Sequence, residues 1–236
     1  MSDAPSEPVP RRLWHTGALL AVAVAVWAAL VVTAPLDSVQ GVIQKILYVH
    51  VPCAFASYLG FAVTGVCSAL YLWKHDERYD RVALSSAEVG VIFCTLMLVT
   101  GPIWGRGTWG KWWSWDPRLT VTLLLWFVYL AYLLLRSFSE GGERTARFAS
   151  VYGVVGVLLI PINYYVIEIF QSRAMHPENL KSGSLGEGMG LPFLMGILTL
   201  LSAFFHLLVS RWEVESLRAR VAREAGEQES LGEEFA

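Results

Sequence analysis

The sequence has few charged residues, and those it has form no surface suited to a nucleic acid. Lys, Arg, Asp and Glu make up 16% of the 236 residues, whereas an average soluble domain has about 25%. The formal net charge is -2, and no stretch carries the run of cations that binding a polyanion requires. Because 55% of the residues are hydrophobic, the composition excludes an ordinary soluble domain, and we expect no nucleic-acid partner.

Cysteine pairs and catalytic motifs are also missing. The three cysteines, Cys53, Cys67 and Cys94, lie in apolar stretches without a C-x-x-C pair, so we interpret them as small buried apolar residues rather than as a disulfide framework. The sequence contains no G-x-x-x-x-G-K-S/T loop for nucleotide phosphates. No pairing of a nucleophile with a base stands out either, and we therefore do not expect an enzyme.

What the sequence does have is six long apolar blocks. They run near 16–35, 48–73, 82–104, 119–137, 148–170 and 191–211. About 20 apolar residues in a helix cross a hydrocarbon core, and the strands of a membrane barrel would instead alternate apolar and polar residues. The first block follows two arginines as a signal peptide would, but its apolar run is longer than a signal peptide needs. We predict an all-α polytopic membrane protein with six transmembrane helices, the first of them uncleaved.

The distribution of Lys and Arg predicts how these helices are oriented. Twelve of the 18 Lys and Arg residues fall on the side that holds both ends of the chain, and six fall on the other side. Because cytoplasmic loops carry the excess of cations, we predict that both termini are cytoplasmic. The predicted organisation is a cytoplasmic segment 1–15, a membrane domain 16–211 and a cytoplasmic tail 212–236.

The segment 104–120, between the third and fourth blocks, is unusually rich in tryptophan and would face outward. It holds five of the ten tryptophans, far more than the scattered rings of an interfacial belt require. Indole faces stack on flat ring systems, cations pair with carboxylates, and glycines permit a close backbone approach. The tryptophans, cations and glycine that we assign to a flat, anionic ligand are Trp109, Trp112, Trp113, Trp115, Arg106, Lys111, Arg118 and Gly110.

Asp116 allows two interpretations. It stands directly before Pro117, which is the arrangement of a helix N-cap followed by proline at the first helical position. It could equally face the ligand, and the sequence leaves both roles open.

The tryptophan-rich segment resembles a known signature. Residues 109–120 follow the pattern W-G-x-x-W-x-W-D-x-R-L-T, which resembles the WWD signature of heme-handling membrane proteins, a superfamily that includes CcmC, CcmF and CcsA. Residues 48–52, Y-V-H-V-P, resemble the segment that opens the second helix of CcmC. The length and the six blocks fit the CcmC family over about residues 14–212, whereas CcmF and CcsA are expected to have more spans.

Two of the five histidines belong with this segment. His50 opens the second block and His176 follows the fifth, so both are predicted on the outer side. Heme iron accepts imidazole nitrogen, and two histidines can fill both axial positions while the tryptophans meet the ring. The resemblance implies that they are the axial ligands: His50 matches by motif and His176 by loop position. A His/Cys site formed by His50 and Cys53 would lack further ligands.

Three other ionisable residues lie within the blocks. Glu88, Glu168 and His206 are costly in a membrane and are functional candidates by default. A proton or ion path is one interpretation. In the other, Glu88 and His206 bond to neighbouring helices and Glu168 reaches the outer interface.

The resemblance implies a function and partners. A CcmC-like protein presents heme b at the outer face of the bacterial cytoplasmic membrane to the chaperone CcmE, which receives it covalently. CcmD, CcmA and CcmB would be further partners, with CcmA supplying ATP hydrolysis, and membrane lipid would surround the helices. A permease is an alternative, for which Pro161 and Asn163 in the fifth block are the only hint of a broken helix. A heme-lyase-type member of the WWD superfamily is another.

Overall fold

The computed structural model describes residues 11–139, 142–170, 175–177 and 185–234. Within these ranges every regular element is a helix. The helices are α1 (Arg11–Thr33), a short 3₁₀ helix η1 (Val42–Ile46), α2 (Leu47–Lys74), α3 (Glu77–Trp109), α4 (Pro117–Phe138), α5 (Gly142–Ile169) and α6 (Gly190–Glu234). Residues 1–10 of the predicted N-terminal segment, and the cations Arg173 and Lys181, lie outside the described residues.

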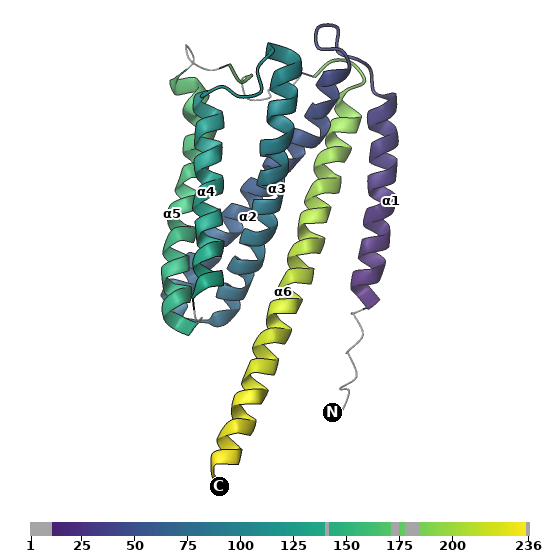
Figure 1. Cartoon of the computed structure of the whole chain (residues 1–236). Coiled ribbons are helices and arrows are strands. Elements are labelled where there is room, and N and C mark those ends of the chain that lie inside the picture. The colour runs from purple at the N-terminus through teal and green to yellow at the C-terminus, as the bar shows by residue number, and fades with distance from the viewer. Residues whose placement is uncertain (1–10, 140–141, 171–174, 178–184, 235–236) are drawn as a thin grey trace.

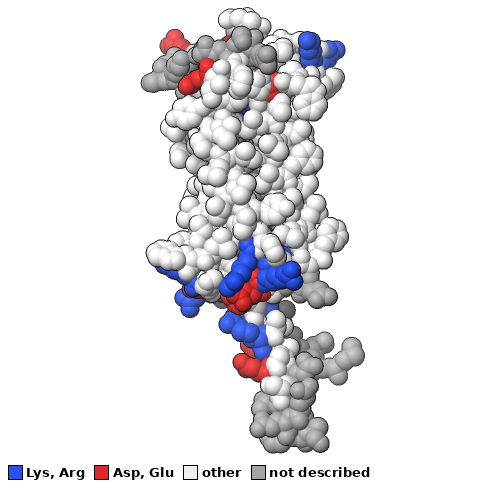
Figure 2. All heavy atoms as spheres, turned by 90° about the vertical axis from the view of Figure 1, so that its left-hand side faces the viewer, with Lys and Arg blue, Asp and Glu red and all other residues white. Residues whose placement is uncertain are grey.

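Six of the helices are long and apolar enough to cross a membrane, which confirms the predicted all-α architecture. A chain in lipid must satisfy its backbone groups internally, and helices do so segment by segment. The helices run between the same two ends of the bundle, and α2 crosses it obliquely (Figure 1). On the face that Figure 2 shows, a broad uncharged band separates two ends where the charged side chains gather. The chain is therefore a multi-pass membrane protein.

The two ends of the helix bundle differ, and we name them by what they carry. The loop end holds η1 and the connection 110–116 between α3 and α4; the tail end holds the start of α1 and the extension of α6 (Figure 1). At the tail end α6 runs on without a break past Trp212 to Glu234. Position 212, where we expected a separate tail to begin, is therefore an interior position of α6.

The third helix is also longer than predicted. It ends at Trp109 rather than near 104, so the first third of the expected loop is helical. Gly110, with φ of 74°, terminates α3 in the left-handed conformation that glycine adopts without strain. Gly107 lies inside α3 where the helix packs on η1, because a Cβ there would come within 2.3 Å of Ile43.

The second helix occupies the middle of the bundle and packs on α3, α5 and α6. Small residues bring α2 and α3 together, since a Cβ on Gly60 would lie 2.9 Å from the Cα of Gly90. The ring of Phe61 on α2 stacks on Tyr129 of α4 with centroids 3.9 Å apart. This packing fixes the middle of α2 against α3 and α4.

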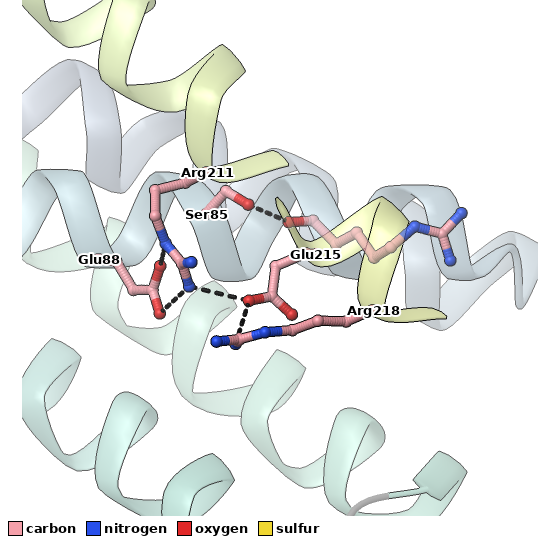
Figure 3. Close-up of polar contacts among 6 residues, drawn as sticks. Ser85, Glu88, Arg211, Glu215 and Arg218 are labelled. Atoms are coloured by element: carbon pink, nitrogen blue, oxygen red, sulfur yellow. Dashed lines mark hydrogen bonds and ion pairs between the residues drawn. The ribbon is translucent and has the colours of Figure 1, made fainter. Parts of the chain in front are cut away.

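Ion pairs join the helices towards the tail end. Arg211 of α6 forms a bidentate bond with Glu88 of α3, at 2.5 and 2.8 Å, and a further bond with Glu215 at 2.8 Å (Figure 3). Arg218 also bonds Glu215, at 2.9 Å. Glu88 therefore pairs with a neighbouring helix, as one of the two interpretations proposed.

The other two ionisable residues also have structural surroundings. His206 of α6 lies 3.0 Å from the hydroxyl of Thr16 on α1, which again joins two helices. Glu168 is exposed one residue before α5 ends, consistent with a side chain that reaches the interface. Neither the bond of His206 nor the position of Glu168 requires a proton path.

Candidate functional site

A cavity opens at the loop end, between α2, α3, α4 and the segment 175–177. Its volume is about 110 Å³, and it opens towards the outside of the bundle. Segments far apart in the sequence meet in its wall. The predicted site residues that line it are His50, Trp109, Lys111, Trp112, Trp113, Arg118 and His176.

The remaining predicted site residues do not line the cavity. The guanidinium of Arg106 donates to the carbonyl of Gly110, so both residues help to terminate α3. Trp115 is 75% exposed and meets Trp113 edge-on, with ring centroids 5.8 Å apart. Asp116 is buried behind the wall.

His50 projects from α2 against α3. Its Nδ1 lies 3.0 Å from the hydroxyl oxygen of Thr100, and that hydroxyl lies 2.8 Å from the carbonyl of Leu96, to which it can donate. When its hydrogen is used there, the hydroxyl accepts from His50, which favours the tautomer with its hydrogen on Nδ1. In that tautomer Nε2 keeps the lone pair that a metal requires.

Two further residues of α3 limit where the His50 ring can lie. The ring of Trp104 meets it edge-on at 5.7 Å, and the indole N–H of Trp104 donates to Gln40 at 2.7 Å. A Cβ on Gly101 would come within 3.1 Å of His50 Cε1. The imidazole is thus enclosed on the α3 side and is left open towards the cavity that it lines.

His176 has the same tautomer by a different route. Its Nδ1 donates to the carbonyl of Pro177 at 2.9 Å, and because a carbonyl can only accept, Nε2 again keeps its lone pair. Burial lowers the pKa of His176, and the bond to the Pro177 carbonyl opposes that shift only in part. His176 is consequently neutral at pH 7, which is the state that binds a metal. Both imidazoles line the same cavity.

Asp116 joins two parts of the site. One carboxylate oxygen accepts from the backbone N–H of Arg118 at 2.8 Å, which makes Asp116 the N-cap of α4. The other oxygen accepts from the backbone N–H groups of Met175 and of His176, the latter at 3.1 Å. Of the two interpretations of Asp116, the geometry matches the structural cap and adds a connection to the segment of His176.

The inner end of the cavity is polar. Tyr58 of α2 donates to the side-chain oxygen of Asn163 on α5 at 2.9 Å, and the Asn163 amide donates to Thr122 of α4 at 2.8 Å. Sequence analysis missed Tyr58 and Thr122 as wall residues. Thr122 stands four residues after Arg118 and so shares its helix face, a spacing that would have identified it.

One hydrogen-bond donor in the wall has no partner. The indole N–H of Trp113 is buried and meets no acceptor among the described residues, and leaving such a donor unmet costs about 1–3 kcal/mol. Cys53 is buried as predicted. Within the described ranges no three His, Cys, Asp or Glu side chains gather as a metal-binding group, so a site built on His50 and Cys53 has no third ligand there.

These features define a multi-pass helical membrane protein with a tryptophan-lined cavity that two neutral imidazoles enter. Residues 6–227 match the model of the family described as heme exporter protein C. The chain belongs to this family, as its resemblance to CcmC predicted, and membership supports a role in heme handling for cytochrome c maturation.

Individual relatives span most of the chain. Heme exporter protein C of Bradyrhizobium diazoefficiens is 34% identical over 193 residues, which are 80% of this chain and 72% of that protein. Heme exporter protein C of Paracoccus denitrificans is 32% identical over 218 residues, 88% of this chain and 90% of that protein. A putative cytochrome c biosynthesis ccmC-like mitochondrial protein of Marchantia polymorpha is 31% identical over 188 residues, 80% and 76% of the two chains.

Proposed function

We propose that this protein binds heme b in the loop-end cavity, at the outer face of the bacterial cytoplasmic membrane, and delivers it to the chaperone CcmE. The observation that carries the proposal is the meeting of His50 and His176 at one cavity, each with its Nδ1 bonded and with no bond at its Nε2 among the described residues. Heme iron takes two axial nitrogens of this kind. The protein's part is to bind, orient and release its cargo, without a catalytic step.

The chemistry of the wall suits heme in three respects. Trp109, Trp112 and Trp113 offer flat apolar faces to a ring system. Lys111 and Arg118 line the same cavity and can pair with the two carboxylates of heme. The unmet N–H of Trp113 supplies a further donor for a ligand oxygen.

Orientation follows from the balance of cations. The tail end carries the larger share of Lys and Arg, so the positive-inside rule places it in the cytoplasm together with both termini. The loop end then faces outward, where a chaperone can reach the cavity. CcmA, CcmB and CcmD are the further partners that we expect, with membrane lipid around the helices.

The structure offers less support for the alternative of a permease. α5 continues as a helix through Pro161 from Gly142 to Ile169, so the expected break is not there. Asn163 is buried and bonds to Tyr58 and Thr122, which accounts for it as a contact between helices. A heme-lyase-type activity would require an apocytochrome site as well as the cavity.

A delivery assay with Trp113→Ala tests the proposal. The wild-type protein or the variant is expressed with CcmE, and covalent heme on CcmE is measured at matched expression of the two. Removing an indole loses about 100 Å² of contact, at roughly 25 cal/mol per Å² about 2.5 kcal/mol, so heme transfer should fall by close to two orders of magnitude.

Trp73→Ala is the matched control, because Trp73 is 76% exposed near the tail end of α2 and should leave transfer unchanged. Equal transfer by the Trp113 variant, the Trp73 variant and the parent would reduce the tryptophan-rich segment to a membrane anchor.

A further inference from the structure

In the part of the chain that the structure describes, the carboxylate of Asp116 bonds the segment that carries His176 to the bundle. Residues 175–177 lie outside the helices. Asp116 accepts from two consecutive backbone N–H groups of this segment, those of Met175 and His176. Asp116 is 2% exposed, so these bonds are shielded from water and are stronger than they would be on the surface.

The same carboxylate also fixes the start of α4. Its first oxygen caps the helix through the N–H of Arg118 at 2.8 Å, and Thr120 contributes a backbone bond to the Asp116 carbonyl at 2.9 Å. The second oxygen is the one that reaches the His176 segment. The two oxygens therefore have separate tasks, and they can be changed separately.

His50 has no such attachment, because it sits directly on α2 with its side chain bonded to α3. Among the described residues, the side chain of His176 bonds locally, to the carbonyl of the next residue. Its position relative to the cavity thus depends on the backbone at residues 175 and 176, which Asp116 holds.

From these contacts we infer that Asp116 is the positioning residue for the axial ligand His176, acting through the His176 backbone and not by touching heme. The inference rests on the proposed heme site. It assigns Asp116 a role distinct from its cap on α4, and it makes the α3–α4 connection and the His176 segment move as one unit.

Asp116→Asn separates the two tasks. Asparagine keeps one acceptor oxygen, which preserves the N-cap, and places an NH₂ group where the second oxygen was, which cannot accept from Met175 or His176. Because bonds to a charged acceptor are the stronger kind, we expect the ratio of six- to five-coordinate heme to fall about tenfold or more. The measurement is the visible spectrum of the full-length heme-loaded protein in detergent.

Three comparisons make the result specific. Asp116→Asn should resemble His176→Ala, should recover the six-coordinate spectrum on addition of imidazole, and should add nothing to His176→Ala in the double variant, since residues that act as a unit are not additive. Asp76→Asn is the control, because Asp76 caps α3 through the N–H of Arg78 in the same way but at the tail end.

The outcomes divide clearly. A wild-type protein without heme would contradict the proposed function itself. A heme-loaded wild type with an Asp116→Asn variant of identical spectrum would leave the heme site standing and overturn the role of Asp116. Loss of heme that imidazole does not restore, or a further loss in the double variant, would show that Asp116 acts through something other than His176 and would equally overturn it.

Discussion

At the scale of single residues, the two imidazoles of the cavity are oriented by different kinds of neighbour. The Nδ1–H of His50 donates to a hydroxyl on another helix, whereas that of His176 donates to a backbone carbonyl beside it. Both arrangements leave Nε2 for a metal. Neither acceptor is a carboxylate, so neither imidazole gains the extra basicity of a carboxylate–histidine pair. That suits a ligand set that must also let its cargo go.

The bond between His50 and the hydroxyl of Thr100 can be tested by replacing Thr100. In Thr100→Val the acceptor of the His50 N–H is lost, so the ring loses its orientation and its fixed tautomer. Outer partners of this kind typically contribute about 10–100-fold to metal affinity, and we expect heme retention to fall within that range. Heme remaining per protein after dilution in detergent is the measurement.

Thr100→Ser provides the matched comparison, because serine keeps the hydroxyl that His50 requires. It should retain heme as the parent does. If the valine and serine variants retain heme equally, the hydroxyl of Thr100 does not orient His50.

At the scale of helices, the sequence predicted the existence of all six spans but not where two of them end. Apolar blocks identify the part of a helix that lies in lipid. α3 extends beyond its block to Trp109 because glycines at 105 and 107 serve close packing rather than a turn. α6 extends to Glu234, and the polar segment beyond its apolar block keeps Val214, Leu217 and Val221 at helical spacing.

Part of the candidate site could be predicted from the sequence, namely the residues that a motif or a residue type indicates. Residue type and a recognisable motif indicated His50, Trp113 and Arg118, and the structure brings all three to one cavity. Contacts between distant segments left no trace in the sequence. Thr100 lies 50 residues after His50, and the bonds from Asp116 to the His176 segment bridge 59 and 60 residues.

At the scale of the whole molecule, the two ends of the bundle are built for different tasks. Arginine–carboxylate pairs tie four helices together towards the tail end: Arg12–Glu213 joins α1 to α6, Arg211–Glu88 joins α6 to α3, and Arg136–Asp80 joins α4 to α3. The loop end is held by aromatic packing and by bonds to backbone, and it opens into the cavity. A rigid base beneath an accessible mouth is an arrangement suited to holding a ligand for another protein.

Orientation in the membrane can be tested directly. A reporter inserted after Val39, which is 91% exposed at the loop end, should be active only outside the cytoplasm. A reporter fused after Ala236 should be active only inside, because α6 carries the chain away from the loop end. The reverse pattern would put the cavity on the cytoplasmic side, where a periplasmic chaperone could not reach it.

The most direct measurement of the central claim is the visible spectrum of the purified protein and of its two histidine variants. Wild type should carry heme with the low-spin spectrum of two axial imidazoles. His50→Ala and His176→Ala should each lose that spectrum and much of the heme, and imidazole added to either should restore six-coordinate heme by filling the vacant position. Wild-type heme content and an unchanged spectrum in both single variants would contradict the assignment of His50 and His176 as the axial ligands.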